Sequence, residues 1–130
     1  MPDETKILIY VVDDDASVRK ALTMLFISAD MEVKTFEAAE DLLKCQLREQ
    51  NTCLISDIKL KGLSGLELKQ KLAEREVKIP VIFLTAFDSN EIRQQAKQAG
   101  AAGFFRKPVD DQALLDTIQW SLSSCLSSKE

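Results

Sequence analysis

Five short runs of apolar and β-branched residues alternate along this chain with five longer stretches of helical period. The first run, Ile7 to Val12, is almost continuously apolar, which is typical of a parallel strand buried on both faces. The other predicted strands are 32–36, 52–56, 80–85 and 101–105. Repeated β-α units of this length need right-handed crossovers. The pattern therefore predicts an α/β fold, a doubly wound parallel sheet of five strands with helices on both faces.

Apolar residues recur three and four positions apart in the helical stretches, as on the buried face of a helix. In chain order they are Val18, Leu22, Leu25, Phe26 and Ala29; Ala39, Leu42, Leu43 and Leu47; Leu68 and Leu72; Ile92, Ala96 and Ala99; and Leu114, Leu115, Ile118 and Leu122. The second helix is expected from about Ala38 to Glu49. Asp14 or Asp15 is expected to cap the first helix, and Gly100 to end the fourth.

Length and charge indicate one domain over residues 1–130. The chain is 45% apolar with a net charge of −4, so it can bury a core and has no general attraction to nucleic acid or anionic membranes. We expect the core to span about 7–122, and the serine-rich residues 123–130 to form a helix end or the start of a linker. The sequence shows no signal-peptide pattern and no apolar run that spans a bilayer, so we expect a cytoplasmic protein.

The chain contains no histidine, and this excludes several classes of enzyme. A Ser-His-Asp triad, an HExxH zinc site and imidazole acid-base catalysis all need that side chain. Cys45, Cys53 and Cys125 are odd in number and lack CxxC spacing, so we interpret them as ordinary reduced residues. Any chemistry must rely on carboxylates, hydroxyls and amines.

Charged and polar residues follow four of the five predicted strands. They are Asp13, Asp14 and Asp15 after the first strand, Asp57 after the third, Thr85 at the end of the fourth and Lys107 after the fifth. Ligands of open parallel sheets bind beyond the carboxyl ends of the strands, where these side chains would meet. Two carboxylates about 4 Å apart repel by roughly 4 kcal/mol at an effective dielectric constant near 20, so a cation is needed. An all-oxygen ligand set predicts Mg²⁺ or Mn²⁺, with Lys107 as a second positive charge.

In this arrangement the chain resembles the receiver domain of two-component response regulators, over about Ile7 to Leu122. The matching residues are the acidic pair Asp13-Asp14, the phospho-acceptor position Asp57, Gly65, Thr85 and Lys107-Pro108. The resemblance implies the flavodoxin-like receiver fold, whose strand order is 2-1-3-4-5. It also implies that Asp57 accepts a phosphoryl group from a phosphohistidine of a sensor histidine kinase, and that the receiver promotes this transfer and the later hydrolysis itself.

The ligand set and the switch are likewise implied by the resemblance. Asp14 and Asp57 would bind Mg²⁺ directly, Asp13 through water, and Lys59 through its backbone carbonyl. The remaining roles fall on three residues: Lys107 and Thr85 would each contact a phosphoryl oxygen, and Phe104 would turn into the space that Thr85 leaves. We also hypothesise that the side chains of Lys59 and Phe87 flank the hydrolytic water and tune the lifetime of the phosphate.

Other functions fit the sequence less well. Haloacid-dehalogenase-like phosphatases also use an aspartate nucleophile, but their second aspartate falls where this chain has Lys59. A flavodoxin-like cofactor module would need a glycine-rich phosphate loop such as GxGxxG, and the four glycines form none. A receiver-like interaction module without phosphorylation stays open.

The opening of the sequence resembles receivers of transcription factors, so we expect a C-terminal DNA-binding effector domain that lies outside this chain, and homodimer formation on phosphorylation. The alternative is a stand-alone or phosphorelay receiver. The expected communicating surface includes Arg93, Lys97, Phe104 and Arg106.

Overall fold

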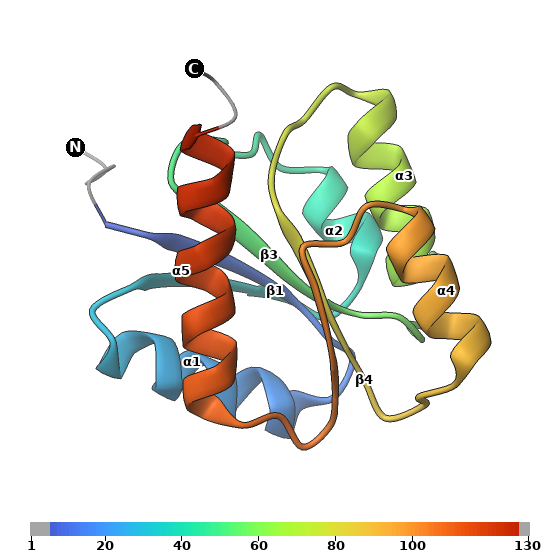
Figure 1. Ribbon diagram of the computed structural model, residues 1–130, viewed down its shortest axis with the longest axis horizontal. Helices are drawn as coiled ribbons and strands as arrows, with labels where there is room; N and C mark the ends of the chain where they lie inside the picture. Colours follow the sequence, from blue (N-terminus) through green and yellow to red (C-terminus); the bar gives the residue numbers. More distant parts are fainter. Residues whose placement is uncertain (1–5, 128–130) are drawn as a thin grey trace.

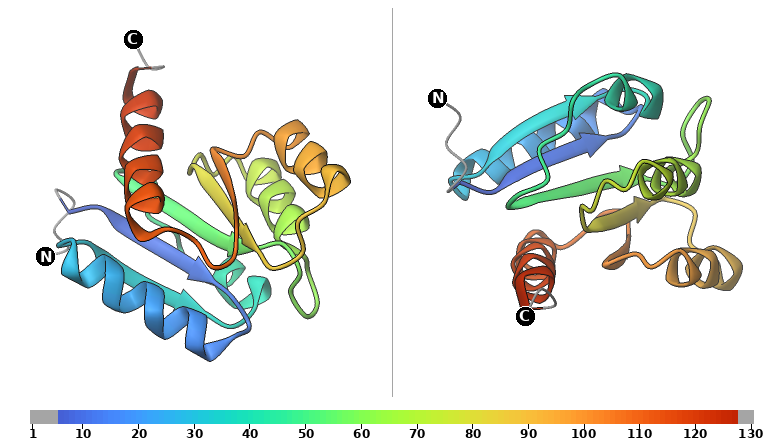
Figure 2. Two further views of the ribbon diagram at one scale, coloured as in Figure 1. Left: turned by 60° about the horizontal axis from the view of Figure 1, so that its bottom comes forward. Right: turned by 90° about the horizontal axis from the view of Figure 1, so that it is seen from above.

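The computed structural model describes residues 6–127 and confirms the predicted doubly wound sheet (Figure 1). The elements are β1 (Leu8–Val12), α1 (Ala16–Ser28), β2 (Glu32–Phe36), α2 (Ala39–Leu43), β3 (Thr52–Asp57), α3 (Gly65–Glu74), β4 (Val81–Thr85), α4 (Asn90–Gln98), β5 (Gly103–Arg106) and α5 (Asp111–Ser127). All strand pairs are parallel, in the order β2-β1-β3-β4-β5. The strands therefore end at one common edge (Figure 2).

The helices cover the two faces of the sheet in separate layers (Figure 1). On one face, α1 and α5 bury Leu22, Phe26, Leu114 and Ile118 against β1, β3 and β4. On the other face, α2, α3 and α4 supply a second buried cluster. Successive strand residues point to opposite faces, so each central strand contributes to both clusters and needs apolar residues throughout.

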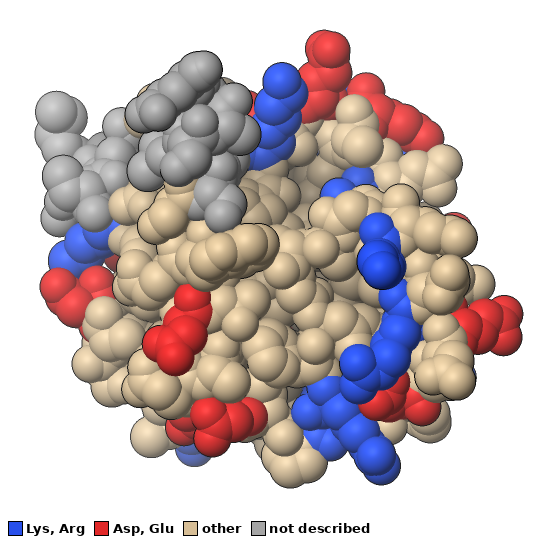
Figure 3. Space-filling model, in the orientation of Figure 1, with Lys and Arg blue, Asp and Glu red and all other residues tan. Residues whose placement is uncertain are grey.

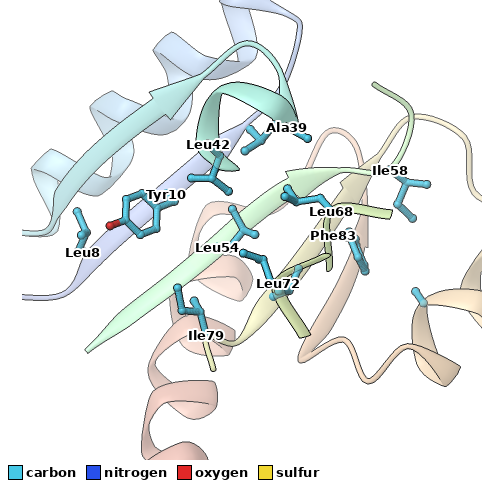
Figure 4. Packing of buried hydrophobic residues seen from close by; sticks show 13 residues of the cluster. Leu8, Tyr10, Ala39, Leu42, Leu54, Ile58, Leu68, Leu72, Ile79 and Phe83 are labelled. Carbon is cyan, nitrogen blue, oxygen red and sulfur yellow. The ribbon is translucent and has the colours of Figure 1, made fainter. Parts of the chain in front are cut away.

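The second cluster joins α2 and α3 to the centre of the sheet (Figure 4). Leu68 and Leu72 of α3 lie over Leu54 of β3 and Phe83 of β4, and all four side chains are at most 2% exposed. Burying a side chain of this size contributes about 1.5–3 kcal/mol. This packing fixes α3, and with it the loop that leads to it from the end of β3.

The second helix is shorter than predicted, because α2 ends at Leu43 instead of continuing to Glu49. Leu47 still packs against the core, but from an irregular segment. The backbone N–H of Arg48 donates to Tyr10 Oη at 2.8 Å instead of to a helical carbonyl. The Arg48 guanidinium donates to the carbonyl of Lys6 at 2.5 Å. These contacts hold the segment after α2 against Tyr10 of β1 and against Lys6, which precedes that strand.

The caps of α1 and α4 agree with the sequence, whereas β5 begins later than predicted. Asp15 caps α1 by accepting from the N–H of Ser17, as expected for one of the two candidate caps. Gly100, at φ +82°, ends α4 as predicted, and the N–H of Ala101 bonds back to Ala96 in a Schellman arrangement. Because Ala101 closes the helix in this way, β5 begins at Gly103, two residues later than predicted.

The C-terminal end of the chain is described only as far as Ser127, where α5 ends. The expectation of a helix end or linker at 123–130 stays a prediction, since residues 128–130 lie outside the described part. Within residues 6–127, the helices are too short or too polar to cross a membrane.

Candidate functional site

The strand register brings the predicted polar residues to one edge of the sheet. Val12 of β1 pairs with Ser56 of β3, so Asp13 and Asp57 are the next residues of two neighbouring strands. Thr85 of β4 pairs with Arg106 of β5, which places Lys107 just beyond the same edge. The site therefore follows from parallel pairing, because all four strands end together here.

Lys107 forms an ion pair with each of two carboxylates. Its Nζ lies 2.7 Å from Asp13 Oδ2 and 2.8 Å from Asp57 Oδ2. The second oxygens accept from backbone groups: Asp13 Oδ1 from the N–H of Asp15 at 2.9 Å, and Asp57 Oδ1 from the N–H of Lys59 at 3.2 Å. The Asp13 side chain is 2% exposed and that of Asp57 10%. These carboxylates are held in fixed orientations, and Lys107 offsets their mutual repulsion.

A third carboxylate, Asp14, completes an acidic cluster that fits a divalent cation. One oxygen each from Asp13, Asp14 and Asp57 lies within 4.8 Å of the other two. Among residues 6–127, no side chain or backbone N–H donates to the Asp14 carboxylate, so its oxygens are available as ligands. Hard oxygen ligands at this spacing suit Mg²⁺ or Mn²⁺.

The buried charges shift the pKa values of the site. Burial raises the pKa of Asp57 and the neighbouring Asp13 charge adds to this, although Lys107 and the N–H of Lys59 oppose it. Burial opposes the charged form of Lys107, but the hydrogen bonds to Asp13 and Asp57 outweigh this and raise its pKa. Lys107 therefore stays positively charged at neutral pH beside the two carboxylates that it contacts.

Thr85 ends β4 beside this cluster and is fully buried. Its backbone carbonyl accepts from the N–H of Lys107 at 2.8 Å, which fixes the backbone. Its Oγ1 accepts from the N–H of Phe87 at 3.0 Å. The hydroxyl proton is free of that bond, so Thr85 keeps a donor to offer to a bound group.

Gly65 lies against the backbone at the end of β3, and this explains the absence of a side chain there. A β-carbon on Gly65 would overlap the carbonyl of Asp57. The N–H of Gly65 donates to the carbonyl of Ile58 at 2.8 Å, and Ser64 and Glu67 cap α3 reciprocally. The loop after Asp57 is thus held closely at both ends.

The side chains of Lys59 and Phe87, both predicted to lie beside the site, contact each other. Lys59 Nζ lies 4.3 Å from the centroid of the Phe87 ring, a cation-π contact between the loops that follow β3 and β4. Both residues also bond to the site through their backbone, Lys59 to Asp57 and Phe87 to Thr85.

Phe104 lies in β5, where Phe83 is its register partner in β4. It is half-buried and packs on the cluster beneath α4, whereas Phe105 packs on the opposite cluster. The guanidinium of Arg93 lies 5.0 Å above the Phe104 ring.

Two contacts near the site were not expected from the sequence. Arg19 Nη1 donates to the carbonyl of Asp13 at 2.6 Å, and Asp88 forms an ion pair with Arg93. The first joins residues six positions apart around a helix start. The acidic residue just before the Ser89 cap of α4 was the only sequence signal for the second.

The site and the fold match a known family. The model of the response regulator receiver domain matches residues 9–119. The transcriptional regulatory protein TdiR of Thauera aromatica is 41% identical over 115 residues, which cover 88% of this chain and 51% of that protein. Nodulation protein W of Bradyrhizobium diazoefficiens is 40% identical over 114 residues, covering 88% and 50%. The chain spans about half the length of these curated relatives.

Solved structures agree with the fold. The response regulator StyR is similar with a TM-score of 0.86 and 40% identity, over 95% of this chain and 63% of that one. The structure of FixJ-N gives a TM-score of 0.79 and 30% identity, over 92% and 93%.

Proposed function

This chain belongs to the response regulator receiver family, and on that premise we propose that it accepts a phosphoryl group on Asp57 from a phosphohistidine of a sensor histidine kinase. The observation that carries the assignment to Asp57 is its position in the acidic cluster. Its carboxylate lies beside two other acids, and its Oδ2 accepts from Lys107 at 2.8 Å. Of the two carboxylates that Lys107 contacts, that of Asp57 is the more exposed, at 10% against 2% for Asp13, so it is the more accessible nucleophile.

The transfer requires positioning and charge compensation more than covalent help from the protein. An Asp57 carboxylate oxygen attacks phosphorus, the bond from phosphorus to the donor nitrogen breaks, and the product is an acyl phosphate. Lys107, already 2.8 Å from Asp57 Oδ2, exchanges part of that contact for a phosphoryl oxygen. Thr85 donates its hydroxyl to a second phosphoryl oxygen.

We assign the metal ligands to the same cluster. Asp14 and Asp57 would bind Mg²⁺ directly, Asp13 through water because its carboxylate is already engaged by Lys107 and Asp15, and Lys59 through its carbonyl. When bound, Mg²⁺ supplies positive charge to the phosphoryl oxygens.

The experiment that tests this proposal is intact mass spectrometry after incubation with acetyl phosphate. With Mg²⁺ we expect a gain of one phosphoryl group, which is lost with EDTA and in Asp57→Asn. Asp111→Asn, which changes an exposed carboxylate at the start of α5, is the matched control and should be modified normally. Equal modification of Asp57→Asn and the parent would contradict the proposal, and no modification of the parent would favour the receiver-like interaction module.

The output is proposed from the relatives. TdiR is a transcriptional regulatory protein about twice the length of the matched region, so we propose that this receiver acts on transcription through an effector domain outside the chain. Reduced Cys45 and Cys53 agree with the cytoplasm as its compartment. A stand-alone or phosphorelay receiver is the second candidate, favoured if the chain is functional alone.

The communicating surface is proposed at α4, β5 and α5. Arg93, Lys97 and Arg106 are exposed, and Figure 3 shows basic side chains gathered over α4 and β5, with acidic ones over the α5 side of the same face. Adjacent patches of opposite charge suit a symmetric homodimer, since each copy offers what the other lacks. We propose that phosphorylation favours such a dimer.

A further inference from the structure

Arg93 of α4 connects the loop after β4 to the aromatic residue of β5. Its Nε donates to Asp88 Oδ1 at 2.6 Å and its Nη2 to Asp88 Oδ2 at 2.7 Å, a two-point ion pair. The same guanidinium lies 5.0 Å from the centroid of the Phe104 ring. Bidentate pairing with a carboxylate and stacking on an aromatic face are two properties that arginine has and lysine lacks.

The ion pair fixes Arg93 more firmly than an ordinary surface pair would. The Asp88 side chain is 18% exposed, whereas that of Arg93 is 54% exposed. The hydrogen bonds from Arg93 lower the pKa of Asp88, so the pair stays charged at neutral pH. Because Asp88 holds two guanidinium nitrogens, the plane of the guanidinium is set as well as its position.

Phe104 is consequently held from two sides. Its ring packs on the buried cluster that contains Phe83 and Ala96. The guanidinium of Arg93 lies on the ring. Any movement of Phe104 must therefore break its contact with Arg93.

The other end of this chain of contacts reaches the acidic site. Asp88 follows Phe87, whose N–H donates to Thr85 Oγ1 at 3.0 Å. The backbone of Thr85 is held in the sheet, so its side chain alone can turn. When it turns, it either draws the N–H of Phe87 with it, which displaces the segment that carries Asp88, or breaks this bond, which releases that segment from Thr85.

We propose that Asp88, Arg93 and Phe104 form a latch that stabilises the unphosphorylated conformation. Asp88 positions Arg93, Arg93 retains Phe104 in its present place, and displacement of the loop through Thr85 and Phe87 releases both. The latch rests on the proposed function, because it takes its signal from a phosphoryl group on Asp57. It assigns a positioning role to Asp88 and Arg93, two residues outside the acidic cluster.

The test follows the Phe104 ring by fluorine NMR of protein labelled with fluorophenylalanine. The six phenylalanines give six signals, and Phe104 is identified by the signal lost in Phe104→Leu. In the unphosphorylated protein, Arg93→Ala and Asp88→Asn should move this signal toward its position in the phosphorylated parent. Arg93→Lys, which keeps the charge without the planar fork, should move it less. Lys97→Ala, which removes an exposed cation from the same helix, is the matched control and should leave the signal in place.

A second readout is the initial rate of phosphorylation by acetyl phosphate. Loss of one cation-π contact shifts a conformational equilibrium by about two- to fivefold, so Arg93→Ala should react faster by about that factor. A parent that gains no phosphoryl mass removes the proposed function and the switch together. A parent that is phosphorylated, with an unmoved Phe104 signal in Arg93→Ala, overturns the latch alone, as does an equal movement in Lys97→Ala.

Discussion

Replacement of Lys107 by methionine removes the cation that separates two buried carboxylates. Lys107 Nζ contacts Asp13 at 2.7 Å and Asp57 at 2.8 Å. Methionine keeps most of the side-chain volume, so the change is mainly electrostatic. We expect Lys107→Met to destabilise the metal-free protein at pH 7.5, because the carboxylates then face one another without compensation.

The magnitude follows from the spacing of the acids. Oxygens of the acidic cluster lie within 4.8 Å of one another. Two unit charges at that distance repel by about 3 kcal/mol at an effective dielectric constant of 20. A loss of about 3 kcal/mol is a large part of the 5–15 kcal/mol by which a domain is typically stable.

The loss should depend on pH with a defined sign. Burial already raises the pKa of Asp57 in the folded state, so this group contributes stability that is complete below its unfolded pKa of about 4 and is lost as the pH rises through the folded value. Without Lys107 the folded pKa rises further. The destabilisation by Lys107→Met should therefore be small at pH 4.5 and near its full value at pH 7.5.

Urea denaturation measures this effect, with Asp57→Asn completing a double-mutant cycle. In the Asp57→Asn background the repulsion between the two acids is absent but Lys107 still pairs with the buried Asp13, so Lys107→Met should cost measurably less than in the parent without becoming neutral. Millimolar Mg²⁺ should restore part of the stability of Lys107→Met. Lys97→Met, at an exposed site, should change the free energy of unfolding by less than about 0.5 kcal/mol. An equal cost of Lys107→Met at both pH values, or in both backgrounds, would refute the electrostatic reasoning.

Three further predictions concern other parts of the molecule. Burial raises the pKa of the Cys53 thiol to about 12, so iodoacetamide at pH 8 should leave Cys53 unmodified in folded protein and label it in urea, as read by peptide mass. Gly65→Ala places a methyl group on the Asp57 carbonyl and should lower the free energy of unfolding by about 1–3 kcal/mol in urea titrations; an unchanged value would show that the loop yields freely. Lys59→Ala and Phe87→Ala each open the cation-π contact above the site and should speed hydrolysis of the acyl phosphate about two- to fivefold; unchanged rates would remove their role in phosphate lifetime.

The strands and the acidic edge were predictable because they depend on local pattern and on one geometric rule. Runs such as Ile7 to Val12 identify parallel strands by composition alone, and parallel strands end at a common edge. Asp13, Asp57 and Lys107 could therefore be brought together without knowledge of their side-chain positions. The strand order was also predicted correctly, but the prediction came from the family resemblance, because periodicity does not determine the order of strands.

The length of α2 was not predictable in the same way. Leu42, Leu43 and Leu47 have the spacing of a helix face, yet the helix stops at Leu43. The competing interaction joins Arg48 to Tyr10, 38 residues earlier in the chain. A local pattern holds no information about a partner that distant, so tertiary contacts overrode the periodicity.

Contacts between side chains of different loops could not be predicted either, because they also depend on tertiary structure. Lys59 and Phe87 were singled out by position, but their mutual contact depends on the paths of two loops. The link from Asp88 through Arg93 to Phe104 joins a loop, a helix and a strand. Such contacts are set only when the packed elements fix each backbone.

The central claim is that Asp57, and neither of the other two acids of the cluster, accepts the phosphoryl group. Borohydride reduction of the protein after treatment with acetyl phosphate and Mg²⁺ converts an aspartyl phosphate to homoserine, and peptide sequencing by mass spectrometry then locates it. We predict homoserine at position 57 alone. Homoserine at position 13 or 14, with Asp57 intact, would contradict the account.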